Sequence, residues 1–321
     1  FAVDQLFVLR PIEHDGLDAA GRGAPRTRKN RPKIIWQSRV KVTKIGWMRV
    51  VVLTSNYHLG ANVAVRNFLD SPLLKKHGIE VVGIVSASTF ALNRPGLKLM
   101  WRFLKTSGLR FFWRTIFVRM WQTVWMRFAR FFVPDSRRKY FEMRELAQMH
   151  KIPYLAVERV NSARALDFVR KAKPDYLVSA LLLQIAKKEL LEIPRRGAIN
   201  FHPALTQQHR GAFTSFWALL NRWRAGGATV HFMTEKLDAG KIILQRRFKI
   251  RRNDTLHSID QRSARIGGIL LAKSLVKLKK QKDATLITKL GQIFSMPRSV
   301  DFSRFRKMGK KIILFSHLFE V

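Results

Sequence analysis

The 321-residue sequence contains no cysteine, few acidic residues and no long uncharged apolar run. The lack of cysteine excludes disulfides, thiolate metal sites and cysteine nucleophiles, and it fits a reducing compartment. No stretch reaches the ~18 uncharged apolar residues that a membrane-spanning helix requires. We therefore expect a cytoplasmic protein without transmembrane helices, and a location peripheral to the membrane remains an open alternative.

Acidic residues are scarce relative to basic ones. The chain has 61 Lys and Arg against 21 Asp and Glu, which gives a formal net charge of +40. Such a charge attracts nucleic acid, anionic lipid or phosphorylated substrates without choosing among them, and an acid-poor proteome gives the same composition without any binding role. The charge alone therefore does not favour nucleic acid as the partner, and the sequence does not indicate an oligomeric state.

The order of predicted elements indicates one α/β domain over residues 48–280. Short β-branched or apolar runs predict strands, and amphipathic segments between them predict helices. The predicted strands are 48–55, 80–86, 152–155, 175–180, 197–201, 228–233 and 241–250, and the predicted helices are 61–70, 138–150, 162–172, 184–192 and 254–280. This alternation predicts a Rossmann-like, doubly wound and mostly parallel sheet.

The two ends of the chain lack this alternation. Residues 1–47 combine glycine and proline with a basic run at 26–33, so we expect a disordered leader that ends before Met48. Residues 281–321 are expected to form a short C-terminal extension.

Residues 90–137 form a basic, aromatic insertion. Residues 98–130 hold eight Lys or Arg, nine aromatic residues and no acid. Helical spacing puts apolar residues on one face and polar residues on the other. The apolar face holds Phe117, Trp121, Val124, Phe128 and Phe132, and the polar face holds Arg119, Thr123, Arg127 and Arg130. Either the aromatic face of this amphipathic helix covers the protein's own sheet, or residues 98–132 bind an anionic membrane surface or a partner.

The segment Gly197-Ala-Ile-Asn200-Phe-His202 carries the most informative chemistry. Two residues apart on a strand, Asn200 and His202 point to one face, near the carboxyl edge where open α/β sheets bind ligands. An amide donor beside an imidazole suits a reaction in which a carbonyl oxygen gains negative charge. An aspartate that reaches the histidine would orient it and favour its cationic form. Acyl transfer is the predicted reaction class.

Several segments together resemble the formyltransferase family. They are Asn200-Phe-His202-Pro-Ala-Leu205, Arg210-Gly211, Gly227-Ala-Thr229 and Leu237-Asp238-Ala-Gly240, which match the family's order and spacing. The resemblance covers residues 48–275 and implies the formyltransferase fold. It also implies transfer of a formyl group from 10-formyltetrahydrofolate to an amine, without a metal, by a catalytic trio of Asn200, His202 and Asp238.

Two sets of residues are candidates for binding the two substrates. Structural alternatives stay open: the residues at 181–184 could pack at a helix start, Arg210 and Gly211 could fix a turn, and His231 could be a buried strand residue. The expected folate-binding residues are Leu181, Leu183, Gln184, Leu237 and Gly240, and the expected acceptor-binding residues are Ser55, Asn56, Gly60, Asn62, Arg210 and Gly211. The loop at 55–62 precedes a predicted helix, whose backbone amides suit a phosphate. The chain departs from the family pattern at 205–208 and 179–181, in loops expected to shape these pockets.

The expected acceptor is a small amine that is phosphorylated or nucleotide-linked. Methionyl-tRNA formyltransferases carry a further β-rich domain, and the residues after 276 are too few for one. A methionyl-tRNA formyltransferase-like enzyme is the first alternative. The second is a non-catalytic basic scaffold that binds membrane or RNA and retains only the fold. For catalysis we expect protonated His202 and Asn200 to stabilise the oxyanion, with Asp238 keeping His202 charged.

Overall fold

A computed structural model describes residues 46–56, 58–88, 101, 104–105, 108–135, 137–138, 140–234, 236–280, 291–314 and 317. Nearly all of the leader predicted at 1–47 lies outside the described residues. So do parts of the predicted insertion and of the C-terminal extension.

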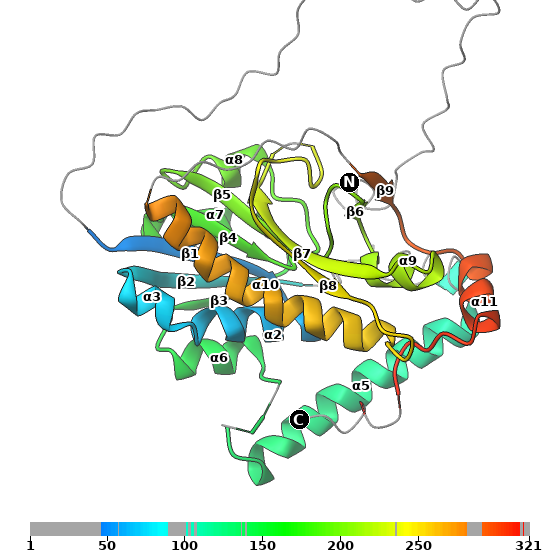
Figure 1. Cartoon of the computed structure of the whole chain (residues 1–321). Helices are drawn as coiled ribbons and strands as arrows, with labels where there is room; N and C mark the ends of the chain where they lie inside the picture. The colour runs from blue at the N-terminus through cyan, green and yellow to red at the C-terminus, as the bar shows by residue number, and fades with distance from the viewer. Residues whose placement is uncertain are drawn as a thin grey trace, which may run out of the picture. The chain divides into compact units, whose positions relative to one another are not determined.

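A seven-stranded sheet forms the centre of the described chain, in the order β3-β2-β1-β4-β5-β7-β8 (Figure 1). The strands are β1 (Met48–Ser55), β2 (Ile79–Ala87), β3 (Tyr154–Val157), β4 (Tyr176–Ala180), β5 (Gly197–His202), β7 (Ala225–Phe232) and β8 (Ile242–Lys249). The first five in this order are mutually parallel, β7 runs against them, and β8, which is antiparallel to β7, runs with them again. The predicted Rossmann-like sheet is confirmed. Because the strand order reverses between β1 and β4, their carboxyl ends flank the crevice where such sheets bind ligands.

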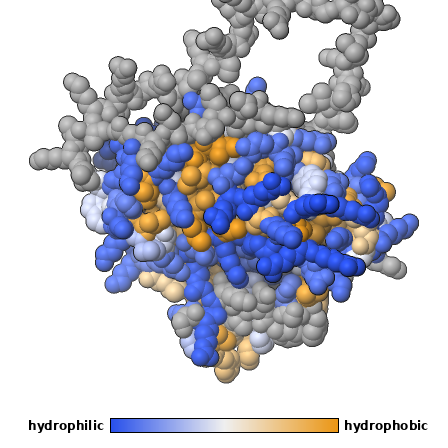
Figure 2. All heavy atoms as spheres, viewed as in Figure 1, coloured by the Kyte–Doolittle hydropathy of each residue, from blue (hydrophilic) through white to orange (hydrophobic). Residues whose placement is uncertain are grey.

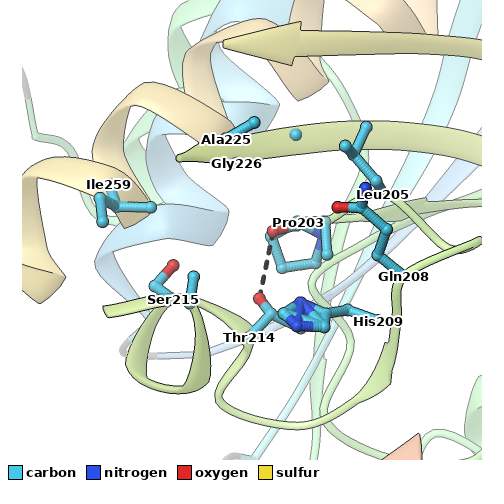
Figure 3. Close-up of a pocket in the computed structure, with 12 residues that line it drawn as sticks. Pro203, Leu205, Gln208, His209, Thr214, Ser215, Ala225, Gly226 and Ile259 are labelled. Atoms are coloured by element: carbon cyan, nitrogen blue, oxygen red, sulfur yellow. Dashed lines mark hydrogen bonds between the residues drawn. The ribbon is translucent and has the colours of Figure 1, made fainter. Parts of the chain in front are cut away.

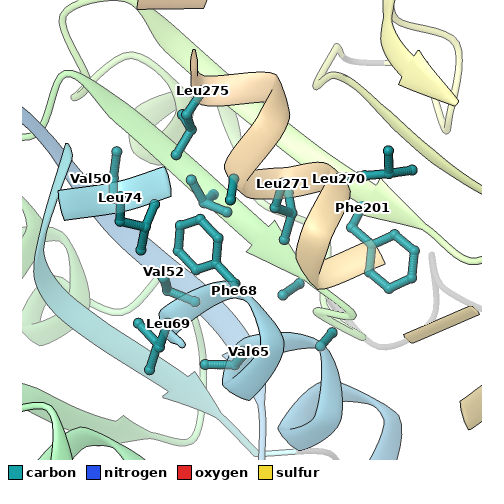
Figure 4. Close-up of a cluster of buried hydrophobic side chains, with 14 of the residues drawn as sticks. Val50, Val52, Val65, Phe68, Leu69, Leu74, Phe201, Leu270, Leu271 and Leu275 are labelled. Atoms are coloured by element: carbon teal, nitrogen blue, oxygen red, sulfur yellow. The ribbon is translucent and has the colours of Figure 1, made fainter. Parts of the chain in front are cut away.

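Helices cover both faces of this sheet. They are α2 (Leu59–Leu69), α3 (Pro72–Lys76), α6 (Met143–Met149), α7 (Ala163–Ala172), α8 (Lys188–Leu191) and α10 (Leu256–Lys279). Along β1, Val50 and Val52 join the core formed with α2 and α10 (Figure 4). Val51 and Leu53 join the core formed with α7 and α8. Burial on both faces explains why this strand is a continuous apolar run rather than an alternating one.

Helix α10 packs closely against β5, the strand that carries two of the predicted site residues. A Cβ atom at Gly267 would lie 2.3 Å from the ring of Phe201, so only glycine allows this approach. Phe201 is 1% exposed and belongs to the larger core. Its burial fixes the orientation of the residues on either side of it.

Residues after 290 add structure that the sequence did not predict. Strand β9 (Gln292–Phe294) pairs in parallel with β6 (His209–Gly211), and α11 (Ser299–Lys307) follows. In a third core cluster, Phe302 and Phe305 of α11 pack on Phe216 of α9 (Thr214–Leu220). This part of the expected C-terminal extension therefore contributes to the fold beside the candidate site.

The described part of the insertion contains α5 (Leu109–Phe132). On its predicted aromatic face, Phe117, Val124 and Phe128 are each more than half exposed. The alternative in which this face covers the sheet is therefore wrong. None of the described helices combines the length and apolar composition that crossing a membrane requires.

Candidate active site

The two antiparallel strands β5 and β7 bring the first site residues together. Ile199 and Phe201 point into the core under α10, so the alternation of the strand turns Asn200 and His202 to the opposite face. In the register of the pair, Asn200 lies directly across from His231 of β7. The Asn200 Nδ2 and His231 Nε2 atoms are 3.3 Å apart.

Asp238 lies at the centre of the site, in the turn between β7 and β8. Its Oδ2 is 3.4 Å from His202 Nδ1 and accepts a hydrogen bond of 2.9 Å from the Gly211 amide. Its Oδ1 is 3.5 Å from His231 Nε2. The turn folds back closely because residue 240 is a glycine and has no side chain. A Cβ atom there would lie 1.8 Å from the carbonyl oxygen of Phe232. The structure therefore brings the predicted trio of Asn200, His202 and Asp238 together.

His231 belongs to the same network. Its Nδ1 lies 2.8 Å from the backbone carbonyl oxygen of Phe232, an acceptor that requires the proton on Nδ1. The Nε2 atom of His231 lies between Asn200 Nδ2 and Asp238 Oδ1, so this ring contacts two members of the trio and orients the Asn200 amide. Only the cross-strand pairing of β5 with β7 reveals this role, because the two residues are 31 positions apart.

Burial determines the charge of the site. It lowers the pKa of His202 by more than the Asp238 carboxylate raises it, so the ring is neutral near pH 7. Burial alone would raise the pKa of Asp238, but His202, His231 and the Gly211 amide outweigh it and hold the pKa below the ordinary value. Burial thus favours a neutral His202 imidazole over the expected imidazolium.

The neutral ring leaves one nitrogen of His202 available. Because Nδ1 faces Asp238, the proton resides on Nδ1 and the lone pair on Nε2. Within the described residues, the buried Nε2 atom has no hydrogen-bond partner. A buried polar atom without a partner is uncommon in a folded protein and points to a ligand at this position.

The expected folate-binding residues divide into two kinds. Leu183 and Leu237 are 36% and 46% exposed, and such apolar side chains fit a pterin ring. Gln184 instead joins three loops: its Oε1 accepts from the Val160 amide, and its Nε2 donates to the carbonyl oxygens of Ser88 and Glu158. Two others support the fold, since Leu181 packs against the larger core and Gly240 permits the Asp238 turn.

The expected acceptor-binding loop at 55–62 uses its side chains within the fold. Ser55 accepts from the Leu183 amide, Asn56 accepts from Ser86, and Asn62 donates to the carbonyl oxygen of Phe141. Gly60, also on the expected list, is buried. These contacts do not support the predicted phosphate site.

Arg210 and Gly211 also support the site rather than open onto it. The Arg210 guanidinium donates to the carbonyl oxygens of Gly291 and Leu237, at 2.9 and 3.2 Å. Gly211 has φ of 91°, and a Cβ atom there would lie 2.3 Å from the Phe294 carbonyl oxygen. Both residues fix the Asp238 turn.

Two hollows of the described chain are both too small for a folate. One, of about 10 Å³, lies between Pro203, His209, Thr214 and Ile259 and has room for no more than one water (Figure 3). The other, of about 260 Å³, opens beside Trp223, Arg224 and Arg247. Within the described part of the chain, no group of three or more His, Asp or Glu side chains is arranged to hold a metal ion.

Comparison with known proteins agrees with this geometry. The sequence model of the formyl transferase family matches residues 136–275, which include the whole trio. The methionyl-tRNA formyltransferase of Thermotoga maritima is 30% identical over 168 residues, which are 50% of this chain and 54% of that protein. That of Clostridium tetani is 34% identical over 47% of this chain and 52% of its own length. Residues 136–275 of this chain are therefore similar to the formyl transferase family.

Two solved structures of low sequence identity share the fold of this chain. Glycinamide ribonucleotide transformylase 1 from Symbiobacterium toebii aligns with a TM-score of 0.52 at 16% identity, over 77% of this chain and 95% of that chain. A formyltetrahydrofolate deformylase from Pseudomonas syringae pv. tomato aligns with a TM-score of 0.51 at 18% identity, over 75% and 66%. The chain spans about half the length of the methionyl-tRNA formyltransferases it matches.

Proposed function

We propose that this chain transfers a formyl group from 10-formyltetrahydrofolate to an amine. The observation that carries the proposal is the buried network in which Asp238 contacts His202 while His231 orients Asn200. This network supplies a hydrogen-bond donor and a base to one site. The exposed apolar side chains of Leu183 and Leu237 fit the pterin of the donor.

In the proposed reaction, 10-formyltetrahydrofolate supplies the formyl group. Asn200 Nδ2 donates a hydrogen bond to the formyl oxygen as negative charge develops there, a contribution of about 10²–10³ in rate for one such donor. His202 Nε2 accepts the proton that the attacking amine loses as its nitrogen bonds to the formyl carbon. Asp238 stabilises the resulting imidazolium, which returns the proton to the departing nitrogen when the old C–N bond breaks.

For the acceptor, we propose a small amine that is phosphorylated or nucleotide-linked. The basic surface suits an anionic acceptor, since the net charge is +40. One observation favours the alternative of methionyl-tRNA: the two relatives described above are methionyl-tRNA formyltransferases. The same charge suits a tRNA backbone equally well.

The test measures donor binding and product formation separately. Calorimetry reports binding of a stable folate analogue, and mass spectrometry reports formyl transfer from 10-formyltetrahydrofolate to three acceptors: a phosphorylated small amine, a nucleotide-linked amino sugar and methionyl-tRNA. We expect one acceptor to gain a formyl group at a rate well above formate release in its absence. His150→Ala is the matched control for His202→Ala. It removes a histidine whose Nε2 lies 3.2 Å from Asp70 Oδ1. No folate binding and no product with any acceptor would leave the non-catalytic scaffold as the remaining interpretation.

A further inference from the structure

Helix α5 carries a continuous line of large apolar side chains on its exposed side, here named the α5 stripe. Its members are Leu109, Trp113, Phe117, Met120, Val124, Phe128 and Phe131. Successive members are three or four residues apart, and this spacing keeps them on one face of an α-helix. Each is between 53% and 69% exposed.

The α5 stripe is a ridge whose orientation the fold fixes. Phe128 of the stripe contacts two neighbouring rings along the helix, with its centroid 5.9 Å from that of Trp125 and 4.7 Å from that of Phe132. Ala129 lies on the side turned away from the stripe and is 2% exposed, while Trp121 and Trp125 are half-buried. Exposed apolar surface of this extent marks an interaction site in soluble proteins.

The charge of the helix narrows the choice of partner. The sequence of α5 contains five arginines and no acidic residue. Of these, Arg127 pairs with Glu142 at 2.9 Å, while the exposed Arg130 has its guanidinium 4.7 Å from the centre of the Phe131 ring. In Figure 2, hydrophobic and hydrophilic residues lie side by side at the lower end of α5. Aromatic side chains flanked by arginine are typical of helices that lie in the headgroup region of a bilayer.

We propose that the α5 stripe binds the surface of an anionic lipid membrane, with α5 lying in the plane of the headgroups. A second copy of this chain is disfavoured, because two chains with a formal charge of +40 each would repel one another. An anionic bilayer attracts the same charge and accepts the apolar side chains, so both features of α5 are used at once. The proposal does not depend on the formyl-transfer activity.

Vesicle co-sedimentation tests the proposal with the full chain. The probes are phosphatidylcholine vesicles and vesicles in which phosphatidylglycerol replaces part of the phosphatidylcholine. The test variant is the triple substitution Phe117→Gln, Val124→Gln and Phe128→Gln. The matched control is Ile269→Gln with Val300→Gln, which changes exposed apolar residues on α10 and α11.

We expect the wild type to bind the anionic vesicles and to release them as salt rises. The triple variant should bind at least about tenfold more weakly, while the control binds like the wild type. Three results would overturn the proposal. Unchanged binding by the triple variant would assign the effect to charge alone, and a large fall in its melting temperature would mean that the chain itself covers the stripe. Wild-type self-association that the triple variant abolishes, without vesicle binding, would assign the stripe to a second copy.

Discussion

The candidate active site and helix α5 reverse the usual distribution of side chains in opposite ways. Between β5 and β7, His202, His231 and Asp238 are polar yet buried. On α5, aromatic side chains such as Phe117 and Phe128 are exposed. Each arrangement costs free energy in the isolated chain. The comparison teaches that both regions are suited to binding, one to a reacting group inside the fold and the other to a surface outside it.

The largest expected effect is on turnover, at the buried polar site. His202→Ala should lower kcat by about 10²–10⁴, because it removes the group that accepts the amine proton. Steady-state kinetics with the identified acceptor checks this, and calorimetry should show that folate binding is retained. Near-normal turnover of the variant would make His202 structural and would weaken the contrast between the two regions.

The second effect concerns the core directly beneath the site. Phe201→Ala should lower the free energy of unfolding by about 3–5 kcal/mol, because it opens a cavity against Gly267 of α10. Urea denaturation followed by circular dichroism measures the change. Phe201→Leu, the matched control, should cost much less, and an equal loss in both variants would point to a strained rather than a close-packed contact.

The third effect is a pH dependence caused by buried neutral imidazoles. Burial, and then the neighbouring His202, lower the pKa of His209 to about 3, whereas the unfolded chain has the ordinary value near 6.5. The unfolded state therefore binds a proton that the folded state does not, and the free energy of unfolding should fall as the pH falls from 6.5 toward 3.

The slope due to His209 should be up to about 1.4 kcal/mol per pH unit. Urea titrations at several pH values measure it, and His209→Asn should flatten it. Asp238 acts in a lower window, because its pKa lies below the ordinary carboxyl value and its stabilising effect is lost only as the pH falls below about 4. An unchanged slope in His209→Asn would mean that His209 is hydrated in solution.

The smallest expected effect is on stability at α5. Phe128→Ala should change the free energy of unfolding by no more than about 0.5 kcal/mol, because the side chain is 53% exposed. Thermal and urea unfolding of Phe128→Ala and Phe201→Ala, measured under the same conditions, compare the two regions directly. A loss of several kcal/mol would show that Phe128 is covered in solution and would remove the contrast with the active site.

Much of the sheet could be predicted because strand signals are local. The run that begins at Met48 gives β1 at its predicted position, and Asp175-Tyr-Leu-Val-Ser-Ala180 gives β4 one residue shorter. The helix expected at 138–150 begins only at Met143, because Glu142 and Glu145 form its capping box. Strands β6 and β9 were not predicted, since three residues each exist as strands only by pairing with one another.

The sequence by itself determined the order of strands and helices, the motifs of the trio and the basic, aromatic character of α5. These depend on periodicity and residue type, which a sequence states directly. Only the tertiary structure decided the burial of His202 and the orientation of Asn200 by His231, because burial and cross-strand contact join residues far apart in the chain. It also decided which side of α5 is exposed, because a helical pattern defines a face but not what packs against it.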